Sequence, residues 1–488
     1  MSPSAPAPAD AKRQTPAPPT KGIDTFFKIS ERGSTISREL RGGLATFFAM
    51  AYIVVLNPII LGAGEDKFHH TLDNGQLVTA TALMAGLTTL LMGIIGNVPI
   101  ALAAGLGINA VVSLQLAPKM SWPDAMGMVV LAGLVLMVLV ASGLRERVMA
   151  AIPGGLRRAI AIGIGLFIAL IGLVDAGFIT RNPDKAHTTV PMGLGIEGKL
   201  QGWPVLVFVV GLALTFVLVV RKTRGAILIG IVTMTVAAVA VNALVDIPDA
   251  AWGLTVPNVP EKIVDTPDFG LIGEVSLFGG FHEVGILTGC LFVFTVLLSG
   301  FFDAMGTIIG VGEEAKLTDE RGQLPGMGRI LMVDGVAVAG GGFGSASANT
   351  CFVESTAGVG EGARTGLANI VTGGLFLLAL VFTPLAKVVP SQAATPALVV
   401  VGFLIMAANV KEIDWSDFTI AIPAFLTMIS MPFTYSITNG IGIGVLSFLL
   451  LRIATRRTRE IPWLLAVVGL CFMVYFLLHP IEQAVGAS

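Results

Sequence analysis

Three acidic side chains lie within long apolar stretches of this chain. They are Asp303 in SGFFDAMGTIIG, Asp334 in ILMVDGVAVAGGG and Glu354 in NTCFVESTAG. An ionisable residue inside a membrane span is costly, so it is a functional candidate by default. No histidine, lysine or arginine interrupts these stretches, so the carboxyls must be hydrated, protonated or hydrogen-bonded. Because a desolvated carboxyl takes up a proton more readily, all three acids are candidates for proton coupling.

Two interrupted segments, at 97–115 and 343–358, accompany the acids. Both begin with small residues, which favour an extended chain, and then become helical. Non-helical backbone at membrane depth persists only where protein or a water-filled cavity satisfies it, and a half-helix N-terminus attracts polar groups. We therefore expect the two segments to meet at a solute site, with Asn109 on the first and Glu354 on the second.

Structural interpretations of the same residues stay open. The two segments could be Gly/Ala-rich packing helices, in which Asn109 only joins helices. Glu354 could cap a helix and Asp303 could hold a structural hydrogen bond. Asp334 fits a structural role best, because its own segment carries no break.

The composition is that of a membrane protein. Of 488 residues, 54% are hydrophobic and 13% are charged, with a mean hydropathy of +0.84, whereas a soluble domain carries about 25% charge. The expected spans run roughly 43–62, 78–95, 125–142, 157–174, 203–221, 225–245, 284–308, 328–341, 366–386, 392–409, 416–433 and 436–454. With the two interrupted segments they make an all-α protein of about fourteen spans.

The interrupted segments are the third and the tenth, seven elements apart. An odd-numbered repeat places its second copy upside down, as in inverted-repeat transporters. The expected organisation is a disordered cytoplasmic tail at 1–22, a first repeat at 23–245, an extracytoplasmic loop at 246–283, a second repeat at 284–455 and a C-terminal helix or tail at 456–488. The stretch 461–478 could be a last span or an interfacial helix.

Loop charge predicts the orientation. With the N-terminus in the cytoplasm, 21 lysines and arginines fall in inside loops and 7 in outside loops, as the positive-inside rule requires.

The net charge of −2 gives no basic footprint for nucleic acid. The three cysteines and five histidines show no disulfide or metal-ligand spacing, so we expect neither metal nor cofactor. No phosphate-binding GK[ST] motif is present, which argues against a nucleotide-driven pump.

Four stretches resemble a known family. They are TFFAMAYIVVLNPIIL at 46–61, PIALAAGLGINA at 99–110, FFDAMGTIIGVGEEA at 301–315 and CFVESTAGVGEGARTG at 351–366. Over nearly all of 25–455 the chain resembles the AzgA-like branch of purine permeases, within the nucleobase–ascorbate transporter superfamily. The Gln-Asn-Gly type of motif of the uracil and xanthine branch is not apparent.

The resemblance implies a proton-coupled importer of adenine, guanine or hypoxanthine in a bacterial-type inner membrane. It implies a core domain of spans 1–4 and 8–11, a gate domain of spans 5–7 and 12–14, elevator-like movement and a homodimer. Asn109, Asp303 and Glu354 match the family's functional residues. Ala104, Leu106 and residues 348–352 depart from its pattern, which puts the choice of base in doubt rather than the class.

The chemistry of the residues suits a purine independently. A carboxylate accepts charge-assisted hydrogen bonds from ring N–H groups, and an Asn side chain satisfies both donor and acceptor edges. Phe302, Phe343 or Phe352 could pack on a ring face. We expect Glu354 to hold the base and Asp303 to hold its opposite edge or carry the coupled proton.

Three other functions compete with this interpretation. An anion or other small-solute transporter of the same architecture would need a cation facing the half-helices, and none is found, because Arg364 lies beyond the tenth segment. An intramembrane enzyme would need a nucleophile with a base, or a metal cluster, within the spans. A channel would favour repeated pore-lining segments in a symmetric oligomer. The purine carried and the choice between H⁺ and Na⁺ stay open.

Overall fold

The protein is a bundle of helices in the part that the structure describes. The computed structural model describes residues 22–143, 152–181, 192–196, 198–223, 225–245, 247–253, 255–260, 262–318, 324 and 326–485. Within these ranges nine helical spans are long and apolar enough to cross a membrane. Shorter apolar helices occupy Ile286–Phe301, Phe418–Phe433 and Trp463–Leu477. The all-α polytopic prediction is confirmed, and the count of fourteen crossings stays a prediction.

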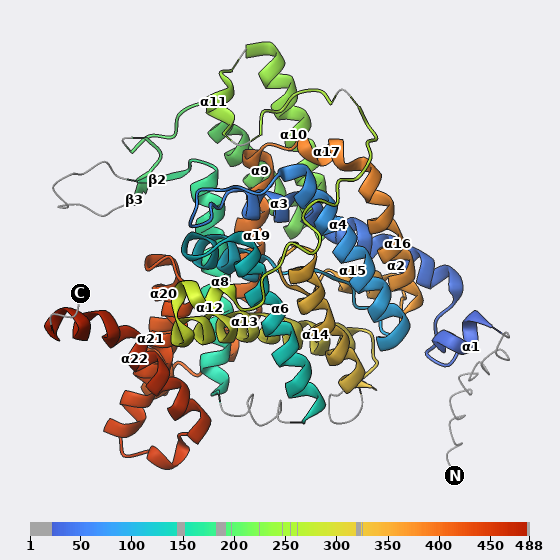
Figure 1. Ribbon diagram of the computed structural model, residues 1–488. Helices are drawn as coiled ribbons and strands as arrows, with labels where there is room; N and C mark the ends of the chain where they lie inside the picture. Colours follow the sequence, from blue (N-terminus) through green and yellow to red (C-terminus); the bar gives the residue numbers. More distant parts are fainter. Residues whose placement is uncertain are drawn as a thin grey trace, which may run out of the picture.

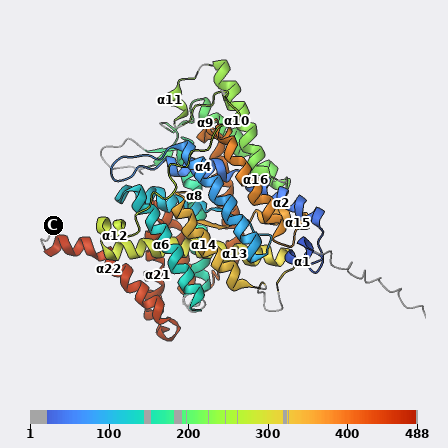
Figure 2. The same cartoon turned by 45° about the vertical axis from the view of Figure 1, so that its right-hand side comes forward.

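One group of helices draws members from both halves of the chain. Its members are α2 (Ile36–Met50), α3 (Ile53–Gly62), α4 (Asn74–Leu91), α6 (Trp122–Ala141), α13 (Ile286–Glu314), α14 (Met327–Phe343), α15 (Ser355–Gly360) and α16 (Leu367–Ala379). Helices α2 and α4 pack against α16, while α13 and α14 pack against α6. Figure 1 and Figure 2 both show α2, α15 and α16 together on the side of the molecule opposite the C-terminus.

A second group also combines the two halves. It contains α8 (Gly154–Asp175), α9 (Trp203–Val220), α10 (Ala226–Val245), α19 (Pro396–Asn409), α20 (Phe418–Phe433) and α21 (Ile437–Ala454). Helix α8 packs against both α19 and α20, and α9 packs against α10 and α19. The α8–α19 crossing joins the first half of the chain to the second at the centre of this group.

The packing of one half mirrors the packing of the other. The contact of α4 with α16 corresponds to that of α14 with α6, and the contact of α2 with α16 corresponds to that of α13 with α6. In the second group, α9 meets α19 and α10 as α20 meets α8 and α21. In each of these comparisons, the helices of the first half are replaced by their equivalents in the second half, and the reverse. Two repeats related by a two-fold operation produce this exchange, as the inverted-repeat interpretation requires.

Shorter elements complete the described chain. They are α1 (Ile23–Phe27), η1 (Met92–Gly96), β1 (Leu102–Ala104), α5 (Leu106–Val111), η2 (Val112–Leu116), η3 (Ala117–Lys119), β2 (Ile179–Arg181), β3 (Met192–Leu194), α11 (Asp249–Trp252), α12 (Gly279–Val284), β4 (Asn349–Cys351), η4 (Leu380–Phe382), α17 (Thr383–Lys387), α18 (Ser391–Ala394), η5 (Val410–Glu412) and η6 (Thr458–Glu460). The third and tenth expected spans are thus both a short strand followed by a short helix, as predicted. The first span is divided into α2 and α3 at Ala51 and Tyr52.

Glycine permits the α8–α19 crossing. A Cβ on Gly402 would lie 2.3 Å from the carbonyl oxygen of Gly165, and a Cβ on Gly165 would lie 2.8 Å from the carbonyl oxygen of Gly402. Real Cβ atoms do not approach backbone oxygens so closely, so the two backbones touch only because neither residue has a side chain. Small residues allow the same close approach between membrane helices generally.

A buried acid fastens α2 to the turn after α15. The Glu39 carboxylate is fully buried and accepts hydrogen bonds from the backbone N–H of Arg364 at 2.8 Å and of Thr365 at 3.3 Å. The Arg32 guanidinium donates to the carbonyl oxygen of Arg364 at 3.0 Å. This network fixes the turn that follows α15 against α2.

The C-terminal helix α22 (Trp463–Val485) runs back along α21. Gly469 packs against Leu449, and the ring of Phe472 covers Gly442. The order of these contacts makes the two helices antiparallel. The stretch 461–478 therefore returns along α21 toward the end at which α21 begins.

Candidate functional site

The two interrupted segments meet as a two-stranded antiparallel ribbon. In the register of β1 with β4, Leu102 lies opposite Cys351 and Ala104 lies opposite Asn349. Helix α5 begins directly after β1, and α15 begins directly after β4 with Glu354 as its N-cap residue. The expectation that these two segments come together is confirmed.

Neighbouring helices satisfy the polar backbone groups that the ribbon leaves unpaired. The Thr89 hydroxyl lies 2.9 Å from both the N–H and the carbonyl oxygen of Leu102. The Asn369 amide donates to the carbonyl oxygens of Val98 at 3.0 Å and Ile100 at 2.7 Å. Non-helical backbone within a membrane needs such partners, so α4 and α16 explain how an extended stretch persists here.

A small cavity lies beside the ribbon, between the two groups of helices. Its volume is about 100 Å³, so it suits a small solute. It is lined by Tyr52, Gly105, Leu106, Gly107, Ile108, Ala161, Ile164, Ile168, Ser299, Thr307, Cys351, Phe352, Val353, Glu354, Val401 and Ile405. The lining from α8 and α19 is apolar. The polar side chains come from α13, from the start of α15 and from the break between α2 and α3.

Among the side chains that the structure describes, Glu354 is the acidic residue that lines this cavity. Its Oε1 accepts a hydrogen bond from the Tyr52 hydroxyl. It does not cap its own helix, because its side chain makes no capping hydrogen bond. Phe352, two residues earlier, is nearly buried and also lines the cavity. A carboxylate beside an aromatic ring and aliphatic walls can hold a flat ring that carries N–H groups.

Asn109 and Asp334 lie near the ribbon but do not line the cavity. Asn109 is fully buried in α5, and within the described structure neither its Oδ1 nor its Nδ2 has a hydrogen-bond partner. Asp334 is buried in α14, where its carboxylate lies 3.6 Å from the Cys351 sulfur. Both residues are therefore buried close to the cavity without being part of its lining.

Two of the predicted site residues, Phe302 and Asp303, belong to α13. The side chains of Phe302 and Asp303 lie outside the described part of the structure. Their backbone belongs to the same helix as Ser299 and Thr307, which line the cavity. Phe343 ends α14 with 55% of its surface exposed, away from the cavity lining.

Tyr52, Ser299 and Thr307 are the polar lining residues that sequence reasoning missed. Tyr52 offered one signal, because it is one of only three tyrosines and lies in the middle of an apolar segment. Ser299 and Thr307 offered little, since hydroxyls in membrane helices commonly bond to their own backbone.

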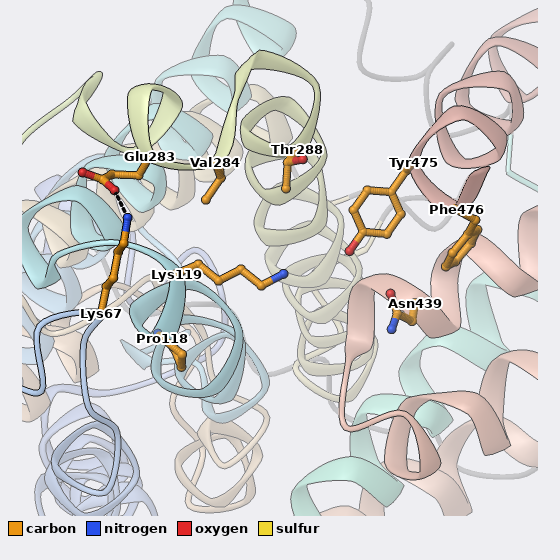
Figure 3. A pocket seen from close by; sticks show the side chains of 9 residues that line it. All are labelled: Lys67, Pro118, Lys119, Glu283, Val284, Thr288, Asn439, Tyr475 and Phe476. Atoms are coloured by element: carbon orange, nitrogen blue, oxygen red, sulfur yellow. Dashed lines mark hydrogen bonds and ion pairs between the residues drawn. The ribbon is translucent and has the colours of Figure 1, made fainter. Parts of the chain in front are cut away.

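A second cavity, of about 580 Å³, lies where η3 approaches α12, α21 and α22 (Figure 3). An ion pair of 2.5 Å between the Lys67 ammonium and the Glu283 carboxylate closes one side. Lys119 points across the cavity toward Tyr475 and Thr288 (Figure 3). None of the predicted site residues lines it, so the cavity beside the ribbon is the candidate site.

Comparison with known proteins identifies the relatives of this chain. The model of the permease family (Xan_ur_permease) matches residues 37–443. The guanine/hypoxanthine permease PbuG of Bacillus subtilis is 38% identical over 460 residues, covering 93% of this chain and 99% of that protein. The adenine permease AdeQ of Escherichia coli is 36% identical over 458 residues, covering 93% and 96%.

Solved structures of other proteins share the fold. The transmembrane domain of the cyanobacterial bicarbonate transporter BicA superposes with a TM-score of 0.57 at 15% identity, covering 83% of this chain and 97% of that domain. SLC26A9 superposes with a TM-score of 0.59 at 15% identity, covering 86% of this chain and 66% of that one. At this identity the likeness concerns the fold alone.

Proposed function

Because this chain belongs to the permease family, we propose that it carries purine nucleobases, namely adenine, guanine or hypoxanthine, across the inner membrane. Two relatives, at 38% and 36% identity, are a guanine/hypoxanthine permease and an adenine permease, which supports a purine base as the substrate. The match spans nearly the whole length of both relatives.

The observation that carries the proposal is Glu354 at the wall of the small cavity. A purine ring presents N–H donors on its edge and two apolar faces. Glu354 accepts from the ring N–H groups, with charge-assisted strength, and Phe352 packs on one face. The aliphatic side chains of Ile164 and Val401 would cover the remaining surface.

Proton coupling belongs to the same proposal. Import against a gradient needs a group that exchanges a proton as the base binds and leaves. Asp303 is the proposed carrier, because it lies on the helix that also supplies Ser299 and Thr307 to the cavity. Glu354 and Asp334 are the further candidates for the proton, and Asn109, whose amide has no hydrogen-bond partner within the described structure, is proposed as a further contact of the base.

Movement of one helix group against the other would expose the cavity to each side of the membrane in turn. We assign the group with α2, α3, α4, α6 and α13–α16 to a moving core, and the group with α8–α10 and α19–α21 to a fixed gate. The bilayer holds both, with the N-terminus in the cytoplasm and the chain paired as a homodimer. The cavity lies between the two groups, where such a movement would open it.

A hydrogen-bond cluster crosses the boundary between the proposed core and gate. The Gln115 Oε1 on η2 accepts from the hydroxyls of Ser436 at 3.1 Å and Thr438 at 3.2 Å, at the start of α21. Thr438 also lies 3.1 Å from the Thr295 hydroxyl on α13. If the groups slide, these bonds must break in each cycle.

A covalent link at this boundary is therefore expected to stop transport. With Thr295→Cys and Thr438→Cys together, the two sulfurs take the places of hydroxyls 3.1 Å apart. Oxidation should then abolish base uptake, and a reducing agent should restore it. Each single cysteine variant is the control and should be insensitive to the oxidant. Unchanged uptake with the disulfide demonstrably formed would contradict the sliding of core against gate.

An anion transporter is the alternative on this fold. It would need a cationic side chain at the solute, and none lines the cavity in the part of the chain that the structure describes. The likeness to a bicarbonate transporter concerns the fold only, so it does not favour that substrate.

Uptake of radiolabelled bases tests the proposal. Cells that lack their own nucleobase permeases are given adenine, guanine, hypoxanthine, xanthine or uracil, with and without a protonophore. Saturable purine uptake that collapses with the protonophore is the expected result. If the protein is shown to be in the membrane and no base is taken up, a purine base is not its substrate.

A further inference from the structure

Tyr52 occupies a break in the first membrane segment. Helix α2 ends at Met50 and α3 begins at Ile53. The Tyr52 carbonyl oxygen accepts from the N–H groups of both Val55 and Leu56, each at 3.0 Å. The ring is almost completely buried, with 1% of its surface exposed. Ala51 and Tyr52 keep helical backbone angles, so the junction between α2 and α3 places the phenol within the first membrane segment.

The Tyr52 hydroxyl reaches across the cavity wall to the one acid described there. It donates a hydrogen bond to Oε1 of Glu354, a residue 302 positions later in the chain. Both residues line the cavity. Glu354 also directly precedes α15, so the bond joins the break of the first segment to the break of the tenth.

From this geometry we propose that Tyr52 is a positioning residue, which turns the Glu354 carboxylate so that its second oxygen faces the transported base. This inference rests on the proposed function, because it names the residue that orients Glu354, the side chain proposed to hold the base. A glutamate has several rotatable bonds, and without a partner its carboxylate would sample several directions. A bond to Oε1 fixes one direction and leaves Oε2 able to accept from a ring N–H.

The bond also supports the charge of the carboxylate. The walls from α8 and α19 are apolar and offer the carboxylate no hydrogen-bond donor. A donated phenol hydrogen bond stabilises the charged form, which is the form that accepts from a base. The phenol would thus act on substrate affinity through Glu354 rather than by contact with the base alone.

Tyr52→Phe removes the hydroxyl and keeps the ring, so it separates positioning from packing. The KM for base uptake is expected to rise about tenfold, the effect of one hydrogen bond to a charged group. The maximal rate per molecule at the membrane should change much less, because translocation does not use the hydroxyl. Melting of the purified protein should be nearly unchanged, since the ring still fills its buried site.

Tyr475→Phe is the matched control, because its phenol lies in the other cavity (Figure 3). It should leave the KM at its original value. The decisive readout is a double-mutant cycle on base binding with Glu354→Asp, in which the effects of the two changes should be non-additive. An unchanged KM in Tyr52→Phe, or strict additivity with Glu354→Asp, would overturn the positioning role. Absence of purine binding by the wild-type protein would instead refute the proposed function, and the inference with it.

Discussion

Glu354→Gln lowers the apparent affinity for the base by roughly 10- to 100-fold. A hydrogen bond to a charged group contributes about 1.5–3 kcal/mol, and about 1.4 kcal/mol corresponds to a factor of ten. Glutamine keeps the size of the side chain but replaces the carboxylate with a neutral amide, one end of which only donates. Concentration-dependent uptake, scaled to the amount of protein at the membrane, measures the change.

Glu314→Gln is the control for this prediction. Glu314 is an exposed residue at the end of α13 and does not line the cavity, so its substitution should leave uptake unaltered. If Glu354→Gln transported the base with its original KM and maximal rate, Glu354 could not be the group that holds it.

Gly402→Ala is expected to weaken the whole fold rather than the binding of the base. The added Cβ would lie 2.3 Å from the carbonyl oxygen of Gly165 and 3.0 Å from the Cβ of Ala169. Helices α8 and α19 would have to separate, and overpacking of this kind costs about 1–3 kcal/mol. The melting temperature of the protein in detergent should fall by several degrees, and less folded protein should be recovered.

Gly374→Ala provides the matched comparison for Gly402→Ala. Gly374 is an exposed glycine inside α16, and a Cβ there would meet no atom within 4 Å. Alanine favours a helix over glycine by about 1 kcal/mol, so this variant should melt at the same temperature or higher. Equal melting of the two variants would show that the α8–α19 crossing is not closely packed in the membrane protein.

The elements of the fold were predictable where a local pattern determines them. Apolar stretches of adequate length predicted the helices, and the small residues before Gly105 and before Glu354 predicted the two extended starts. That these starts pair with each other followed from their equivalent places in two repeats. The register of the pairing did not follow, because two strands of only three residues each permit several alignments.

The contents of the cavity were predictable only in part. Glu354 and Phe352 stood out because one is charged and the other aromatic in a broken segment. Tyr52 did not, because a tyrosine in an apolar segment is equally typical of a membrane interface. Its contact with Glu354 joins residues 302 positions apart, and no local sequence pattern predicts such a contact. Asn109 was expected to touch the solute; it is buried and does not line the cavity, so its contact with the solute stays a prediction.

The direct test of the central claim is a structure of the protein with a purine base bound. The claim predicts density for the base in the cavity beside β1 and β4, with ring N–H groups within hydrogen-bond distance of Glu354 and one face on Phe352. Density for the base in the cavity of Lys119 and Tyr475, with the cavity beside the ribbon empty, would contradict it.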